Sequence, residues 1–256
     1  MPKKTPWIGT SWKMNKTRAE AREFALALAG SSVAKTIAAK PFVIPPFTAI
    51  ADVAERLAGT RVAVGAQNMH WAPAGAWTGE ISAAMIRDAG ASLVEIGHSE
   101  RREHFGETNE TVALKTKAAI DNGLLALVCV GDTRAEYEAG RTSEVLATQV
   151  RFAVSHLSAG DRGRIVIAYE PVWSIGEGGV PADPDFAADQ HRCIKEVSTS
   201  PFGEPVDVVY GGSVNPDNCV PLATRPNIDG LFIGRSAWRV EGYIGIVEKV
   251  TAALAG

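Results

Sequence analysis

Cysteine is scarce in this 256-residue sequence. Its three cysteines, Cys129, Cys193 and Cys219, lie far apart and form no Cys-x-x-Cys pair, which excludes a disulfide framework and a cysteine zinc site. The histidines likewise lack the spacing of metal ligands. We therefore expect no structural metal, and we expect Cys129, in the apolar run LLALVCV, to be a small buried hydrophobic residue.

The sequence also lacks an excess of charge and long apolar runs. Its formal net charge is −3, so no basic field is available for nucleic acid or an anionic membrane, and any phosphate must be bound locally. No run approaches the roughly 18 apolar residues of a membrane span, and the first residues are not followed by the apolar segment of a signal peptide. We expect a cytoplasmic enzyme that contacts neither membrane nor nucleic acid.

Short, β-branched apolar segments recur along the chain, separated by amphipathic stretches. Each segment is nearly continuously hydrophobic, as in strands buried on both faces of a parallel sheet. The predicted strands cover residues 7–9, 42–44, 62–66, 93–96, 124–130, 165–169, 206–210 and 231–233. The predicted helices cover residues 17–29, 50–58, 81–88, 111–120, 142–154, 186–197 and 241–254, and Asp183 followed by Pro184 indicates a capped helix start.

This alternation has the dimensions of a (β/α)8 barrel, which typically needs about 250 residues. A doubly wound open sheet alternates in a similar way, but no G-x-G-x-x-G fingerprint follows the first predicted strand. We therefore favour the barrel. Because no linker or shift in composition divides the chain, residues 1–256 are expected to form a single domain.

Active sites of such barrels are built from the loops that follow the strands. The polar residues just past the predicted strands should therefore converge on one mouth. They are Ser11 and Lys13 after the first strand, His98 after the fourth, Glu170 after the sixth, Ser213 after the seventh and Arg235 after the eighth.

Two of these residues have acid–base chemistry. Most glutamates lie at the surface, but Glu170 ends a buried strand, where partial desolvation increases its strength as a base. His98 precedes residues 99–102, which could begin a short helix, and a helix N-terminus favours a neutral imidazole that donates a hydrogen bond. A purely structural histidine is the alternative.

Lys13 lies between Trp12 and Met14, an apolar setting for a charge. A lysine among large apolar neighbours usually extends its ammonium group to water. The alternative is that it is held inward by a bound anion, and the local sequence does not decide between the two.

Glycines follow the last two predicted strands, at Gly212 in YGGSV and at Gly234 in FIGR. Free backbone N–H groups next to a helix N-terminus bind anions, and barrels often hold phosphate at this place. A tight turn is the alternative, but the location favours phosphate. The glycine-rich segment 171–181 predicts a lid that excludes water, although a plain flexible connection would have a similar composition.

The motifs WKMN, AQN, GAWTGEIS, GHSERR, FGE, AYEPVW, YGGSV and DGLFIG occur in this order over nearly the whole chain. Together they resemble the triosephosphate isomerase family, whose members are TIM barrels. The resemblance implies an isomerase that acts on a small phosphorylated sugar through an enediol, with no metal and no organic cofactor.

The resemblance also implies roles for individual residues. Glu170 would remove the proton next to a ketone, and neutral His98 would exchange protons with the enediol oxygens. Lys13 would supply positive charge, with Glu100 as its acidic neighbour. Phosphate would be bound at Gly176, Ser213 and Gly234, and the loop from Gln67 to Thr78 would insert into a partner subunit of a homodimer.

Several residues depart from the family pattern. Ser11 replaces an asparagine that helps bind the substrate oxygens, and Arg235 replaces a second glycine beside the phosphate. Asp132 stands where glutamate is common, and the lid ends in residues 179–181, Gly-Val-Pro, with Glu177 at its tip. Arg235 could contact the phosphate or point to solvent.

These departures resemble those of bacterial paralogues that interconvert L-erythrulose 1-phosphate and D-erythrulose 4-phosphate. Ser11 would leave room for the hydroxymethyl group of such a four-carbon substrate. The alternative is triosephosphate isomerase itself, acting in glycolysis and gluconeogenesis. A non-catalytic barrel that binds phosphorylated sugars is a remote third possibility, because such a protein has no need for a base under a lid.

Overall fold

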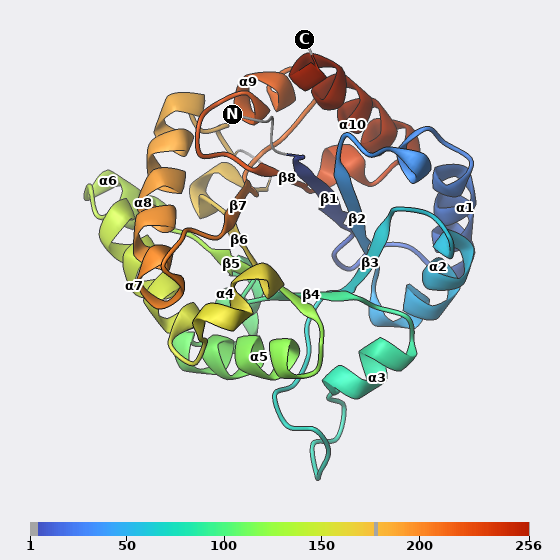
Figure 1. The fold of residues 1–256 in the computed structure, drawn as a ribbon, viewed down its shortest axis with the longest axis horizontal. Helices are drawn as coiled ribbons and strands as arrows, with labels where there is room; N and C mark the ends of the chain where they lie inside the picture. Colours follow the sequence, from blue (N-terminus) through green and yellow to red (C-terminus); the bar gives the residue numbers. More distant parts are fainter. Residues whose placement is uncertain (1–4, 177–178, 256) are drawn as a thin grey trace.

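A closed barrel of eight parallel strands forms the centre of the molecule, with helices around it (Figure 1). The structure is a computed structural model and describes residues 5–176 and 179–255. It confirms the predicted barrel over the open sheet, because β1 pairs with both β2 and β8. The strands are β1 Trp7–Ser11, β2 Lys40–Ile44, β3 Ala63–Ala66, β4 Leu93–Ile96, β5 Leu125–Val130, β6 Ile165–Tyr169, β7 Asp207–Tyr210 and β8 Gly230–Ile233.

The helices agree with the predicted ones within two residues at each end, except that α8 continues to Phe202, beyond the predicted end at residue 197. They are α1 Arg18–Ala29, α2 Ile50–Leu57, α3 Ala83–Asp88, α4 Ser99–Phe105, α5 Asn109–Asp121, α6 Arg134–Glu138, α7 Thr142–Val154, α8 Pro184–Phe202, α9 Cys219–Ala223 and α10 Val240–Ala255. The expected cap is confirmed, because the Asp183 side chain accepts the N–H groups of Asp185 and Phe186. The five-residue helices α6 and α9 were not predicted, since such short helices show no measurable periodicity.

Two apolar clusters cover the two faces of the strands. The smaller one fills the barrel interior and contains Phe42, Ile44, Leu93, Leu127, Cys129, Val166, Ala168, Val209 and Phe232. The larger one packs between the strands and the surrounding helices. Residues two apart in a strand share a face, so both faces are apolar, which explains the continuous hydrophobic runs. Cys129 is fully buried here, as expected.

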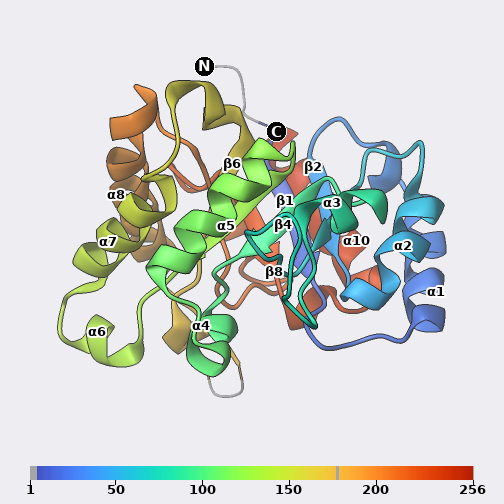
Figure 2. The same cartoon turned by 90° about the horizontal axis from the view of Figure 1, so that it is seen from below.

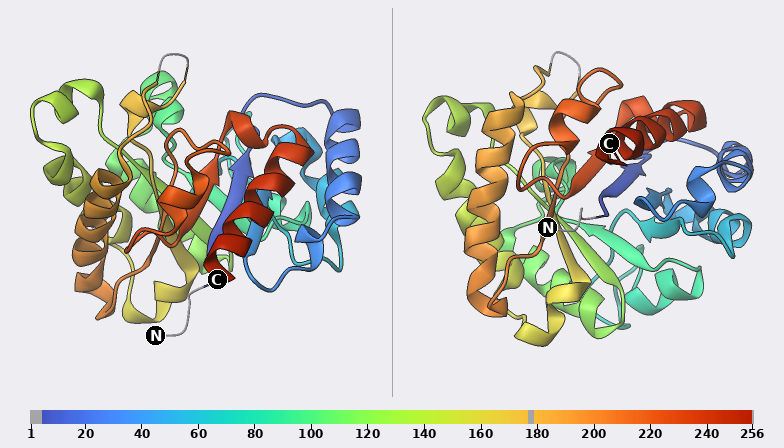
Figure 3. Two further views of the ribbon diagram at one scale, coloured as in Figure 1. Left: turned by 90° about the horizontal axis from the view of Figure 1, so that it is seen from above. Right: turned by 45° about the horizontal axis from the view of Figure 1, so that its top comes forward.

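The arrangement of the strands places the loops that follow them at one end of the barrel. Figure 2 shows α4 and α6 at this end, and the left view of Figure 3 shows the β1 arrow pointing toward it. The loop between β3 and α3 projects beyond the ring of helices (Figure 1). Within residues 5–176 and 179–255, no helix has both the length and the hydrophobicity needed to span a lipid bilayer.

Candidate active site

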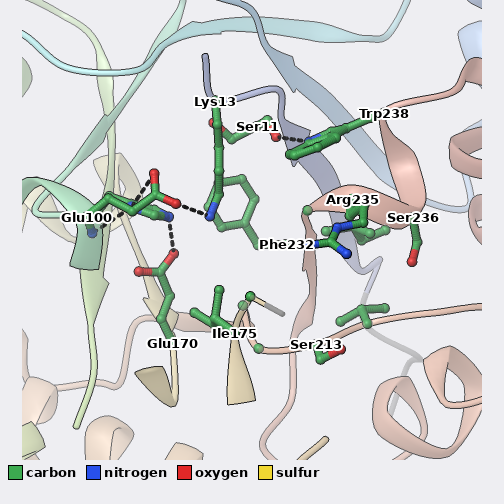
Figure 4. A pocket seen from close by; sticks show the side chains of 17 residues that line it. Ser11, Lys13, Glu100, Glu170, Ile175, Ser213, Phe232, Arg235, Ser236 and Trp238 are labelled. Carbon is green, nitrogen blue, oxygen red and sulfur yellow. Dashed lines mark hydrogen bonds and ion pairs between the residues drawn. The ribbon is translucent and has the colours of Figure 1, made fainter. Parts of the chain in front are cut away.

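A cavity of about 300 Å³ opens at the end of the barrel where the strands terminate (Figure 4). All ten predicted site residues line it, namely Ser11, Lys13, His98, Glu100, Glu170, Gly176, Gly212, Ser213, Gly234 and Arg235. The expectation of a single mouth is therefore met. One placement was wrong: Ser11 is the last residue of β1 rather than part of the loop after it.

Glu170 follows β6 directly, and its side chain is almost fully buried. Its Oε2 accepts the backbone N–H of Ser99 at 3.3 Å, at the start of α4. On the other side, a Cβ atom at Gly211 would lie 3.0 Å from the Glu170 Cγ, so a side chain at this position would push the Glu170 side chain aside by a few tenths of an ångström. Burial raises the pKa of the neighbouring Cys129 thiol well above its usual value, which keeps this thiol protonated.

His98 is the N-cap residue of α4, as the sequence predicted for a helix starting at residue 99. Its Nδ1 accepts the backbone N–H of Glu100 at 3.1 Å. A ring nitrogen that accepts such a bond carries no proton, so the imidazole is neutral and its proton is on Nε2. Nε2 lies 3.3 Å from Oε1 of Glu170, so the imidazole faces the carboxylate.

Two sequence motifs around His98 hold the backbone that carries it in place. The backbone of Gly97, which has a left-handed φ of 76°, is bound from both sides. Its N–H donates to the Glu107 carboxylate at 3.2 Å, and its carbonyl accepts from the Arg102 Nε at 2.9 Å. The GHSERR and FGE segments therefore fix the chain just before His98.

Lys13 points along the cavity wall, and its Nζ donates to Oε1 of Glu100 at 2.6 Å. The apolar neighbours diverge, since Trp12 is fully buried and Met14 is 97% exposed. The Lys13 backbone has a φ of 52°, rare for a residue other than glycine, and its carbonyl accepts from the Gln67 Nε2 at 2.9 Å. Burial alone would raise the pKa of Glu100, but the bond to Lys13 and nearby positive charges outweigh burial and lower it.

The opposite side of the cavity consists of backbone-rich loops after β7 and β8. A Cβ atom at Gly212 would lie 2.3 Å from the Tyr210 hydroxyl oxygen, so this position requires glycine. Gly234 is followed at once by the short 3-10 helix Arg235–Ala237. Arg235 lies at the exposed rim of the cavity. Short helices and glycine loops in this position are typical of phosphate sites in barrels.

Glu95 is a cavity residue that the sequence analysis missed. Leu93 points into the barrel interior, so Glu95, two residues further along β4, shares its direction. Glu95 is 2% exposed, its Oε2 accepts the Ser11 hydroxyl at 2.8 Å, and its Oε1 lies 3.9 Å from the His98 Nε2. The available signal was a single carboxylate that interrupts the apolar run 93–96.

A comparison of the chain with models of protein families finds a match over nearly its whole length. The family model described as triosephosphate isomerase matches residues 6–250. The chain belongs to the triosephosphate isomerase family.

Its relatives within the triosephosphate isomerase family include proteins named L-erythrulose-1-phosphate isomerase. The one from Rhizobium rhizogenes (strain K84 / ATCC BAA-868) is 56% identical over 251 residues, which cover 98% of this chain and 96% of the relative. The one from Brucella abortus (strain 2308) is 57% identical over 244 residues, which cover 95% of each chain.

Asp132, one of the departures from the triosephosphate isomerase pattern, lies below the start of the predicted lid. This buried carboxylate accepts hydrogen bonds from Tyr169 Oη at 3.1 Å, Thr142 Oγ1 at 2.7 Å and Trp173 Nε1 at 3.2 Å. Trp173 lies at the start of the predicted lid, so Asp132 anchors that end of it. Glu177 lies outside the described residues.

Three side chains could in principle hold a metal ion: ligand atoms of Glu95, His98 and Glu170 lie within 4.8 Å of one another. The hydrogen bonding of His98 opposes this, because its Nδ1 lone pair is engaged by the backbone and its Nε2 carries the proton. A metal on Nε2 would have to displace that proton and break the bond at Nδ1. The geometry therefore fits proton transfer better than metal binding.

Burial raises the pKa of Glu95 to about 7, and the charge of Glu170 adds to the shift, whereas the hydrogen bond from Ser11 and the charge of Lys13 oppose it. The usual value of 4.5 applies to the unfolded chain. Between these two values the folded state holds a proton that the unfolded state has released. Stability is therefore lost as the pH rises from 4.5 to 7, by about 3 kcal/mol in total.

We predict that Glu95→Gln stabilises the protein at pH 8 by about 3 kcal/mol relative to wild type, and by little at pH 4.5. The amide keeps the size of the carboxyl group but carries no charge to bury. Urea unfolding of both proteins at the two pH values measures the difference. Glu103→Gln on the exposed face of α4 is the control and should change little at either pH. An equal effect of Glu95→Gln at both pH values would contradict the prediction.

Proposed function

We propose that the protein interconverts L-erythrulose 1-phosphate and D-erythrulose 4-phosphate. The observation that carries this proposal is the identity of 55% to 57%, over nearly the whole chain, with proteins named L-erythrulose-1-phosphate isomerase. The short side chain of Ser11 at the cavity supports it, because it leaves room beside the reacting carbons. Triosephosphate isomerase activity remains the alternative for the same set of side chains.

In the mechanism that this geometry supports, Glu170 takes the proton from the carbon that bears the hydroxyl group. The electron pair left behind forms the enediolate, and its negative oxygen accepts the Nε2–H of His98 and faces the Lys13 ammonium group. Glu170 then returns the proton to the carbon that previously carried the carbonyl group. His98 moves a proton between the two oxygens, so no cofactor is required.

The phosphate group would lie at the other side of the cavity. We assign it to the backbone N–H groups around Gly212, Ser213 and Gly234, with Arg235 at the rim as a further cation. Gly176 and the rest of segment 171–181 would cover the substrate and exclude water during proton transfer. Excluding water strengthens the electrostatic effect of Lys13 on the enediolate.

The proposal is tested by assaying the purified protein with both substrate pairs. We expect a higher kcat/KM for the erythrulose phosphates than for the triose phosphates. A kcat/KM for glyceraldehyde 3-phosphate near the diffusional ceiling of about 10⁸–10⁹ M⁻¹s⁻¹, with little turnover of the four-carbon pair, would refute it. Ser11→Asn should lower four-carbon turnover more than Ser11→Ala does, because asparagine adds bulk and alanine does not.

We also propose a homodimer formed through the loop from Gln67 to Thr78. In this loop the His70 ring packs on Trp71 and Trp77, with centroid distances of 4.1 and 4.3 Å, and Trp77 is still 49% exposed. Met14, beside the cavity, is 97% exposed, and a partner subunit would cover it. Sedimentation equilibrium tests the assembly, and the mass of a single chain would contradict it. A cytoplasmic location stays a prediction.

A further inference from the structure

We propose that Glu95 and Ser11 form a specificity-determining pair that binds the terminal hydroxyl of a four-carbon ketose phosphate. This inference rests on the proposed function, since it assigns a binding site to the hydroxymethyl group that a triose phosphate lacks. The pair is a carboxylate and a hydroxyl from β4 and β1, joined by a hydrogen bond of 2.8 Å across the barrel interior.

Two adjoining cavities define the direction in which the substrate lies. A second cavity of about 190 Å³ adjoins the first, and both are lined by Ser11, Lys13, His98 and Glu100. Glu95 lines only the second cavity, whereas the loops assigned to phosphate line only the first. A substrate with its phosphate on those loops and its reacting carbons at His98 therefore extends its far end toward Glu95.

Glu95 lies close to the side chains that act on the reacting carbons. The His98 Nε2, which faces the enediol oxygens, lies 3.3 Å from Oε1 of Glu170 and 3.9 Å from Oε1 of Glu95. Glu95 is thus next to the reacting carbons but on the side away from the phosphate. A substituent on the distal reacting carbon has Ser11 and Glu95 as its polar neighbours.

The hydrogen-bonding groups of Ser11 and Glu95 match those of a primary alcohol. A primary alcohol donates one hydrogen bond and can accept two, and Ser11, which donates to Oε2 of Glu95, keeps lone pairs to accept the alcohol's proton. Glu95 lines the second cavity, and a carboxylate has lone pairs beyond the one that Ser11 uses, so it can accept a further hydrogen bond from a ligand there. A buried polar group with an open position favours a substrate that fills it over one that leaves it unpaired.

The test compares Glu95→Val with wild type on both substrate pairs. Loss of a hydrogen bond to a buried polar group predicts a fall in kcat/KM for the erythrulose phosphates of roughly 10- to 100-fold relative to the triose phosphates. The effect should fall mainly on KM, because the hydroxyl is bound in the ground state as well as in the transition state. Glu95→Gln, which retains hydrogen-bonding atoms and volume, should retain much of the preference.

Arg235→Ala is the matched control at the phosphate end, because it removes the side-chain cation that is assigned to the phosphate. It should lower kcat/KM for both substrate pairs by the same factor and leave their ratio unchanged, since both substrates carry phosphate. An equal loss for both pairs in Glu95→Val and in Glu95→Gln, or no loss in either variant, would overturn the inference. Absence of four-carbon turnover in wild type would instead overturn the proposed function, so the two failures are distinct.

Discussion

Glu170→Asp should lower kcat on the order of 100-fold while leaving substrate binding largely intact. The substitution withdraws the carboxylate by one methylene, roughly 1 Å, and misplacement on this scale costs about that factor in rate. The surroundings do not allow the shorter side chain to follow, because Oε2 is held by the Ser99 N–H and Oε1 faces the His98 Nε2 at 3.3 Å. Steady-state kinetics with the preferred ketose phosphate measure the effect.

The matched control is Glu103→Asp, which removes the same methylene from an exposed glutamate on α4. It should leave kcat unchanged, whereas Glu170→Gln, which removes the base altogether, should be at least as slow as Glu170→Asp. Full activity in Glu170→Asp would refute the assignment of the base. Tight binding of the sugar phosphate by wild type without any turnover would favour a non-catalytic barrel.

The barrel could be predicted from the sequence because each strand is buried on both faces. Burial on both faces makes the apolar run continuous, and the glycines and polar caps between runs mark the turns. The Asp183–Pro184 start of α8 was predicted for a local reason, since the cap lies next to the residues it satisfies. The five-residue helices α6 and α9 could not be predicted, because so few residues do not show the periodicity of a helix.

Glu95 shows what the sequence could not reveal about the site. Its importance depends on the partner across the barrel, Ser11, which lies 84 residues away in the chain. In sequence it is one polar residue in a buried strand, with no sign of the face it occupies. Asp132 is similar, because its three hydrogen-bond donors come from separate elements. The hydrogen-bond partners of both residues depend on the three-dimensional arrangement of the strands and the loops that follow them, which the sequence alone does not give.

The cost of burying Glu95 and its proposed role are related. A carboxyl group that is ionised above pH 7 at the expense of stability is a poor choice for a structural position. Glutamine at the same place would fill the space without that cost. A stabilising effect of Glu95→Gln together with the loss of substrate preference in Glu95→Val would identify this position as one where binding is favoured over stability.

Lys13→Met should lower kcat/KM by roughly 10²- to 10³-fold, the range for losing one group that stabilises an oxyanion. Methionine retains an unbranched apolar stem but has no charge to place beside the enediolate. The ammonium group serves the cavity rather than the fold, because both partners of its ion pair retain access to water, with the Lys13 side chain 22% and the Glu100 side chain 45% exposed. Exposed pairs contribute little to stability, so the variant should unfold at nearly the same urea concentration as wild type.

Lys16→Met provides the control for this experiment, since Lys16 lies in the same loop and also has a positive φ, of 77°. Its ammonium group lies over the rings of Trp12 and Phe24, at 5.3 and 5.2 Å, and it lines neither cavity of the site. Lys16→Met should therefore alter stability slightly and catalysis not at all. Equal losses of activity in the two variants would show that the loop conformation, and not the charge of Lys13, supports the reaction.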